Sequence, residues 1–187
     1  LHSFLSPQTN TRTDQYGGSL ENRVRVLKEI VDKIKAKAGQ DFPVLTKVNS
    51  YDNGPGGTTL ETFPALAAAI AKTGVDAIEL TGGIPAVSGI DDPTEQSYHA
   101  RYAKALDVEV PIILTGGNKN IDVMERLFKP GTIDFFGIAR PIIRQPDLPN
   151  AWLSTSTAAE CTCESCNECL RVHVFEGEPF LTCQLDA

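Results

Sequence analysis

Short apolar runs alternate along this chain with longer segments whose apolar residues recur at helical spacing. The apolar runs predict buried strands over 44–48, 77–81, 110–115 and 133–138. The amphipathic segments predict helices that begin after the capping residues Ser19, Thr59 and Asn120. They predict two further helices over 95–106 and 147–153. Residues 1–18 are polar and rich in turn formers, so the pattern predicts no regular element there.

This alternation places the chain in the α/β fold class. Apolar strands separated by helices form a parallel sheet with helical cover, and both a doubly wound sheet and a (β/α) barrel have this order. A full barrel has eight strands in about 250 residues, whereas this chain of 187 residues offers four. The barrel interpretation therefore predicts a half-barrel over residues 1–153. A half-barrel needs a partner to cover its sheet edges and inner face.

Composition narrows the classes of partner. The chain has 17 Lys and Arg against 24 Asp and Glu, a net charge of −7, which argues against nucleic acid or an anionic membrane as a partner. The most apolar stretch, Phe63–Ala71, is much shorter than the ~20 residues of a membrane span. The first residues show no secretory leader and no cysteine precedes Cys161, so we predict a reducing, cytoplasmic setting.

Two ionisable residues fall inside predicted elements. Lys47 stands within the first strand, where an ammonium group is costly to bury unless an anion meets it. It could pair with a carboxylate such as Glu79, face a bound cofactor, or form a Schiff base with a carbonyl substrate. His99 lies beside Tyr98 on a predicted helix, and we expect it at the surface rather than in a catalytic role.

Two strands end in turns suited to a phosphate. Gly116, Gly117 and Asn118 follow the third strand, and Ala139 and Arg140 follow the fourth. Glycine lets backbone N–H groups approach a phosphate, and arginine can bind one through two parallel hydrogen bonds. Tight-turn geometry alone also explains a Gly-Gly pair. Because ligand sites form at the carboxyl ends of parallel strands, the two turns together predict a phosphate-binding site.

The tail over residues 154–187 contains all five cysteines, behind a predicted linker at 154–157. Four of them have the density of a metal site, namely Cys163, Cys166, Cys169 and Cys183. Thiolates at such spacing suit zinc or an iron–sulfur cluster, and the spacing does not separate the two. Free thiols in the tail are the alternative.

The opening segment contains a long, nearly unbroken motif. It reads Phe4-Leu5-Ser6-Pro7, then Asn10-x-Arg12-Thr13-Asp14-x-Tyr16-Gly17-Gly18-Ser19-x-Glu21-Asn22-Arg23. This motif resembles the segment after the fourth barrel strand in the old yellow enzyme family of NADH:flavin oxidoreductases. Later pieces resemble the family's fifth to eighth strands in order, over 43–50, 77–83, 111–118 and 134–141. The chain thus resembles the C-terminal half of a (β/α)8 TIM barrel, strands 5–8.

The resemblance implies an ene-reductase-like activity. Members of the family contain FMN, take a hydride from NADH or NADPH, and pass it to a small activated alkene, typically an α,β-unsaturated carbonyl. Lys47 matches a basic residue, usually arginine, at the flavin N1/O2 edge, where a cation stabilises the negative charge of the reduced ring. The residues that match cofactor contacts of the family are Lys47, Gly116, Gly117, Asn118, Ala139 and Arg140.

The same resemblance leaves the catalytic residues unassigned. The family's substrate-polarising His with His or Asn, and its proton-donating Tyr, belong to the end of the fourth strand, upstream of the segment that matches Leu1. We therefore expect the chain to be inactive alone and to need an N-terminal half-barrel or self-association. Two alternatives remain: a phosphate-binding Schiff-base lyase that uses Lys47, and a non-catalytic self-associating half-barrel. Some family members carry a [4Fe–4S] cluster at a similar cysteine tail, with a third gap one residue longer.

Overall fold

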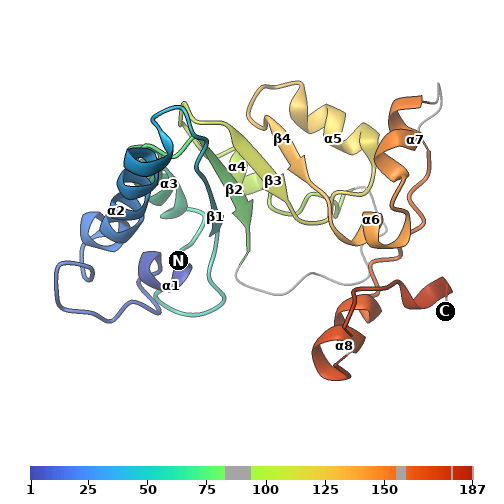
Figure 1. The fold of residues 1–187 in the computed structure, drawn as a ribbon, viewed down its shortest axis with the longest axis horizontal. Helices are drawn as coiled ribbons and strands as arrows, with labels where there is room; N and C mark the ends of the chain where they lie inside the picture. The colour runs from blue at the N-terminus through green and yellow to red at the C-terminus, as the bar shows by residue number, and fades with distance from the viewer. Residues whose placement is uncertain (83–93, 155–158, 178, 187) are drawn as a thin grey trace.

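The computed structural model describes residues 1–82, 94–154, 159–177 and 179–186. Within these ranges, four parallel strands form one sheet in chain order (Figure 1). The strands are β1 (Leu45–Asn49), β2 (Ala77–Thr81), β3 (Ile112–Thr115) and β4 (Phe135–Gly137). β2 coincides with the apolar run that predicted it, β1 is shifted by one residue, and β3 and β4 are shorter strands inside their runs. The order and pairing confirm the parallel α/β class.

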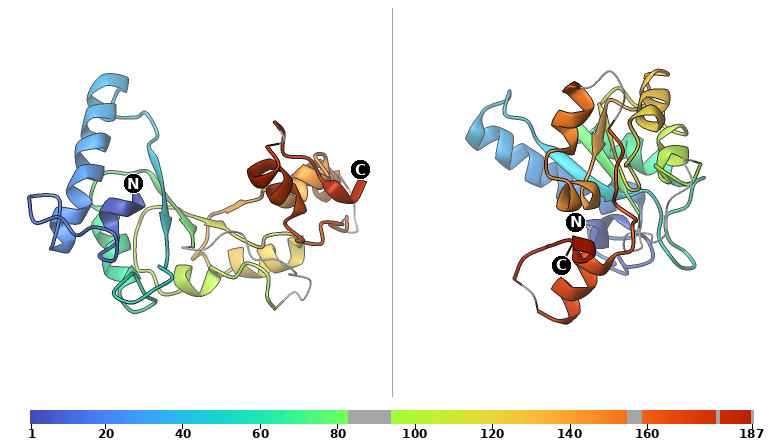
Figure 2. Two further views of the ribbon diagram at one scale, coloured as in Figure 1. Left: turned by 90° about the horizontal axis from the view of Figure 1, so that it is seen from below. Right: turned by 90° about the vertical axis from the view of Figure 1, so that its right-hand side faces the viewer.

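Helices fill the connections between strands and continue beyond β4. In the left view of Figure 2, α3 (Phe63–Ala71), α4 (Ala100–Ala103) and α5 (Ile121–Phe128) lie along one side of the sheet. The other helices precede β1 or follow β4, and they are α1 (His2–Leu5), α2 (Leu20–Ala38), α6 (Arg140–Arg144), α7 (Leu148–Ser154), α8 (Glu168–Phe175) and a 3₁₀ turn at Gln184–Asp186.

The two faces of the sheet differ in their cover. Successive side chains of a strand point to opposite faces. On the helix side, Val48, Leu80 and Leu114 are at most 1% exposed. On the other side, Leu45 and Phe135 are 54% and 58% exposed. The open face is the one that turns inward when such a sheet closes into a barrel.

The helix α2 forms as its sequence predicted. Ser19 caps it, because the Ser19 hydroxyl accepts a hydrogen bond from the Asn22 N–H at 3.2 Å. Val24, Leu27 and Val31 recur at helical spacing and are all buried. This apolar stripe packs against the core beside α3, which fixes α2 on the helix side of the sheet.

Two predicted helices begin later than expected. The helix predicted after Thr59 begins at Phe63, because Thr59 instead holds a preceding turn in which its hydroxyl accepts from the Thr62 N–H at 3.3 Å. The helix predicted over 95–106 is reduced to the four residues of α4. Ser97 has φ +52°, and this left-handed conformation ends any helix that would run through it.

The hydrophobic pattern did not predict three of the described helices, α1, α6 and α8. All are short, and helices of fewer than about 12 residues are marginal without tertiary contacts. α1 is held by a carboxylate from the loop after β1. His2 Nε2 is hydrogen-bonded to the Asp52 carboxylate, and the Ser6 hydroxyl donates to the same carboxylate at 2.6 Å. Such contacts join distant parts of the chain, so a local pattern does not reveal them.

The structure tests the predicted linker and the predicted absence of a membrane span only within the described residues. The predicted linker at 154–157 lies outside the described residues except for its first residue. In the part of the chain that the structure describes, no helix combines the length and the apolar character needed to cross a membrane. The cytoplasmic setting and the domain boundary after residue 153 stay predictions.

Candidate functional site

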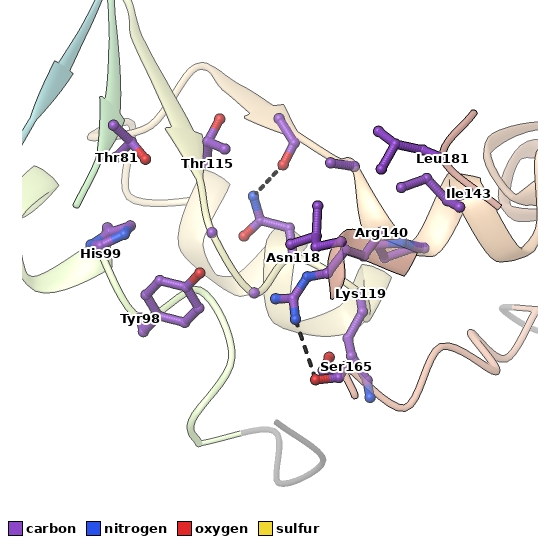
Figure 3. Close-up of a pocket in the computed structure, with 16 residues that line it drawn as sticks. Thr81, Tyr98, His99, Thr115, Asn118, Lys119, Arg140, Ile143, Ser165 and Leu181 are labelled. Atoms are coloured by element: carbon purple, nitrogen blue, oxygen red, sulfur yellow. Dashed lines mark hydrogen bonds between the residues drawn. The ribbon is translucent and has the colours of Figure 1, made fainter. Parts of the chain in front are cut away.

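The ends of β3 and β4 open onto a pocket of about 220 Å³ (Figure 3). Its walls come from the turn after β3, the start of α6, the segment before α4, and the cysteine-rich tail. Five residues predicted to bind a phosphate line this pocket, namely Gly116, Gly117, Asn118, Ala139 and Arg140. The structure therefore brings together the two turns that the sequence placed at neighbouring strand ends.

The glycine pair after β3 is required by both backbone and space. Gly116 and Gly117 have φ of +122° and +72°, a region that strongly favours glycine. A Cβ on Gly117 would lie 2.8 Å from the ring of Tyr98, and one on Gly116 would lie 2.7 Å from the ring of His99. The turn therefore packs closely against two aromatic rings. This packing and the positive φ angles explain the two glycines whether or not a ligand binds there.

Asn118 holds the two strand ends together. It is 3% exposed, and its amide nitrogen donates to the carbonyl oxygens of Leu114 at 2.7 Å and Gly137 at 2.9 Å. Its amide oxygen accepts from the Ser97 hydroxyl at 2.7 Å. Asn118 thus joins β3, β4 and the segment before α4 through its side-chain hydrogen bonds.

Arg140 begins α6 and is 9% exposed. Its Nη1 donates to Asn167 Oδ1 at 2.6 Å and to the Ser165 carbonyl oxygen at 3.4 Å. Figure 3 shows the guanidinium extending over the pocket towards Ser165. On the same side, Lys119 Nζ donates to the Cys163 carbonyl oxygen at 2.8 Å. Cationic side chains at this pocket are therefore oriented by the cysteine-rich tail.

Lys47 lies on the open face of the sheet but does not line the pocket. Its Nζ is 2.8 Å from Glu79 Oε1, and the Thr115 hydroxyl donates to that same oxygen at 2.7 Å. The ion pair with Glu79 was one of the alternatives for this lysine, and the structure contains it. The three side chains form a polar row across β1, β2 and β3 that meets the pocket only at Thr115.

His99 is buried, and the prediction that it lies at the surface is wrong. It is 3% exposed and sits among the rings of Tyr51, Tyr98 and Tyr102 at the edge of the pocket. Its Nδ1 is buried with no hydrogen-bond partner among the described residues. Burial, with a smaller contribution from the charge of Arg101, lowers the pKa of His99 to about 4. The ring is therefore a neutral part of the pocket wall at neutral pH.

The four tail cysteines predicted to bind a metal line one small cavity of about 20 Å³. Arg140 and Arg144 line it too, and Arg144 Nη1 lies 3.3 Å from Cys183 Sγ. Across the described ranges, no three His, Cys, Asp or Glu side chains come together in a way that could hold a metal ion. A metal at the tail stays a prediction.

The opening motif has a structural role in this molecule. Asn10 Nδ2 donates to the carbonyl oxygens of Phe4 at 2.6 Å and Tyr16 at 2.7 Å, which closes the loop that leads into α2. A Cβ on Gly17 would lie 2.0 Å from the Arg12 carbonyl oxygen, so only glycine fits there. None of these residues lines the pocket at the ends of β3 and β4.

The pocket fits the phosphate end of a nucleotide better than a whole nucleotide. It has a glycine turn on one side and an arginine on the other, the groups that bind a phosphomonoester. Its volume of about 220 Å³ is below the ~300–1,000 Å³ of pockets that enclose larger ligands. The rest of such a ligand would extend over the open sheet face, where Thr81 and Thr115 form the rim.

This arrangement defines part of a (β/α) barrel with its pocket at the carboxyl ends of the strands, the usual place for a ligand site in that fold. The sequence profile of the NADH:flavin oxidoreductase / NADH oxidase family matches residues 1–154. The chain belongs to this family, and its four strands are part of the family's barrel.

Known relatives extend well beyond this chain. It is 33% identical over 192 residues to a protein named metal reductase from Desulforamulus reducens, and 30% identical over 183 residues to an NADH oxidase from Thermoanaerobacter brockii. These alignments cover 100% and 95% of this chain but 28% of each relative. A solved 2-naphthoyl-CoA reductase with 2-naphthoyl-CoA is 33% identical, with a TM-score of 0.77 over 93% of this chain and 27% of that one. The chain thus spans less than a third of these proteins.

Sequence reasoning missed several residues of the site. Tyr98 and His99 pack on the glycine turn, and Ser165 and Asn167 contact Arg140. The Cys-Asn-x-Cys pattern around Asn167 was visible in the sequence, but it was interpreted only through its cysteines. An asparagine between two candidate ligands tolerates the left-handed backbone of a tight turn, and that property could have singled it out.

Proposed function

We propose that this chain is the flavin-nucleotide-binding part of an NAD(P)H-dependent oxidoreductase that reduces activated alkenes. The observation that carries the proposal is the pocket in which the glycine turn after β3 faces Arg140 at the start of α6, in a member of a flavin oxidoreductase family. An anionic phosphate suits this combination of backbone N–H groups and guanidinium.

In this proposal some residues of the chain bind the phosphate of the flavin nucleotide, and another supplies a positive charge near its ring. Gly116, Gly117 and Arg140 hold the phosphate of FMN, and Asn118 keeps the two strand ends at a fixed separation. Lys47, held by Glu79 on the open face, supplies a cation on the side where the ring would lie. Bound FMN would supply the ring that accepts a hydride from NAD(P)H and passes it on.

The substrate class rests on the family resemblance, and no residue of the chain is assigned to proton transfer. The relatives' names cover a naphthoyl-CoA reductase, an NADH oxidase and a metal reductase, so the name of a relative does not fix the substrate. Since the chain spans less than a third of these proteins, we expect residues 1–187 alone to be inactive. The rest of a barrel, from an N-terminal half or a second copy, would complete the site.

The first test compares the full-length protein that carries this sequence with residues 1–187 alone. We expect the longer protein to bind about one FMN per chain and to reduce cyclohexenone with NADH or NADPH, and the shorter chain to show no turnover. Flavin absorbance measures binding, and loss of the enone absorbance measures reduction. A full-length protein that binds no FMN would contradict the proposal, and turnover by residues 1–187 alone would contradict the expected inactivity.

The full-length protein also tests the alternative that Lys47 is the Schiff-base residue of a lyase. An exposed Lys47 paired with Glu79 is unlike the desolvated amine that Schiff-base chemistry uses. Borohydride treatment with a carbonyl substrate should therefore leave Lys47 unmodified in a peptide mass analysis. A reduced adduct on Lys47 would favour the lyase.

The tail cysteines are proposed to bind a metal, either zinc or an iron–sulfur cluster, both of which suit thiolate ligands. The four thiols line one small cavity. They would have to turn towards one another, since no group of three metal-binding side chains exists among the described residues. In protein purified without air we expect bound zinc or iron, lost in Cys183→Ser, and metal analysis distinguishes the two. Neither metal in the unmodified protein would overturn this.

A further inference from the structure

One asparagine of the tail contacts Arg140 in the wall of the proposed phosphate pocket. Asn167 Oδ1 accepts a hydrogen bond of 2.6 Å from Arg140 Nη1, and the Ser165 carbonyl oxygen lies 3.4 Å from the same nitrogen. Because an arginine side chain has several rotatable bonds, a fixed acceptor at its end selects one orientation of the guanidinium. A hydrogen bond with a charged donor is also stronger than a neutral one. Asn167 is therefore placed to decide where Arg140 points.

The backbone around this contact adopts an uncommon conformation. Ser165 and Asn167 have φ of +56° and +67°, and they stand on either side of Cys166. Non-glycine residues in this region are uncommon, and such conformations persist where the surrounding structure requires them. Asparagine tolerates the left-handed region better than most residues. The turn thus aims both the Ser165 carbonyl and the Asn167 side chain at Arg140.

The tail contacts the pocket at residues other than Arg140 as well. Lys119, which also lines the pocket, donates through Nζ to the Cys163 carbonyl oxygen at 2.8 Å. Ser165 and Leu170 of the tail line the pocket itself. The tail is therefore a wall of the phosphate pocket, although its sequence suggests a separate cysteine motif.

We propose that Asn167, in the Cys166-Asn167-x-Cys169 segment, is a positioning residue that orients Arg140 towards the phosphate of a bound flavin nucleotide. This inference rests on the proposed function, because it needs a phosphomonoester in the pocket. Asn167 acts through Arg140 and does not itself touch the ligand. Its effect should therefore appear only for ligands that carry the phosphate.

FMN and riboflavin provide the test, since they differ only in that phosphate. In the full-length protein, Asn167→Gly removes the amide while allowing the left-handed backbone. We expect its affinity for FMN to fall about tenfold, the scale of one hydrogen bond to a charged group. Its affinity for riboflavin should stay unchanged. In an Arg140→Ala background, Asn167→Gly should cause no further loss of FMN affinity.

Asn53→Gly is the matched control, because it removes the same amide from an exposed loop position. It should leave both affinities unchanged. If the unmodified protein binds FMN no better than riboflavin, the proposed phosphate pocket is wrong. If that preference exists but survives in Asn167→Gly, or if riboflavin affinity falls equally, the positioning role of Asn167 is wrong while the pocket stands.

Discussion

Replacing Arg140 with alanine in the full-length protein is expected to weaken FMN binding about a hundredfold and to leave riboflavin binding nearly unchanged. Removing one partner of a buried, hydrogen-bonded charge pair costs about 2–5 kcal/mol, and each 1.4 kcal/mol is a factor of about ten in affinity. Arg140 is 9% exposed at the pocket wall, so water compensates little for its loss. Titration of each flavin by fluorescence quenching gives the two affinities.

Arg144→Ala is the matched control for this prediction. Arg144 lies on the same helix α6 and also contacts the tail, through Thr162 and Cys183, but it does not line the pocket at the ends of β3 and β4. Its loss changes the net charge by the same amount. We expect Arg144→Ala to bind FMN within about threefold of the unmodified protein, because long-range charge effects are screened by salt. Equal losses in the two variants would mean that net charge near α6, rather than a phosphate contact by Arg140, governs binding.

His99 is expected to make the folded protein lose stability as the pH falls from about 6.5 towards 4. Burial lowers the pKa of His99 to about 4 in the folded state, against about 6.5 in an unfolded chain. Between these values the unfolded chain binds a proton that the folded one does not, so the free energy of unfolding rises with pH. Acidification to about pH 4.5 should therefore cost about 2–3 kcal/mol from this residue alone.

The variant His99→Phe isolates this contribution. Phenylalanine keeps an aromatic ring among Tyr51, Tyr98 and Tyr102, and it has no proton to bind. Arg101, the charged residue that also disfavours the protonated ring, stays in place. Urea unfolding at pH 7 and at about pH 4.5 should show a much smaller loss for His99→Phe than for the unmodified protein. The same loss in both would show that His99 is not the group that titrates.

The strands and the location of the site were predictable because burial leaves a periodic trace in the sequence. The run 77–81 is β2 to the residue, and Ser19 caps α2 as its chemistry predicted. Once the strands were placed, the rule that parallel strands end at one edge put Gly116–Asn118 beside Ala139 and Arg140. Those five residues do line a single pocket, although their roles towards a ligand stay predictions.

The surroundings of the site were not predictable in this way. The segment before α4 was expected to be helical, and its left-handed Ser97 instead places Tyr98 and His99 on the glycine turn. The tail was interpreted as a separate metal motif, whereas Ser165 and Asn167 contact Arg140 from about 25 residues further along the chain. Neither arrangement leaves a repeating pattern in the sequence, because each depends on contacts between residues that are distant in the chain.

By itself, then, the amino-acid order determined a parallel α/β sheet that is part of a barrel, its membership of a flavin oxidoreductase family, and the turns at the strand ends that line the pocket. Only the tertiary structure decided that Lys47 pairs with Glu79, that His99 is a neutral ring in the pocket wall, and that Asn167 holds Arg140. The physical reason is that periodicity records which face of an element is buried. The partner of a buried polar group is set by packing between elements that are far apart in the chain.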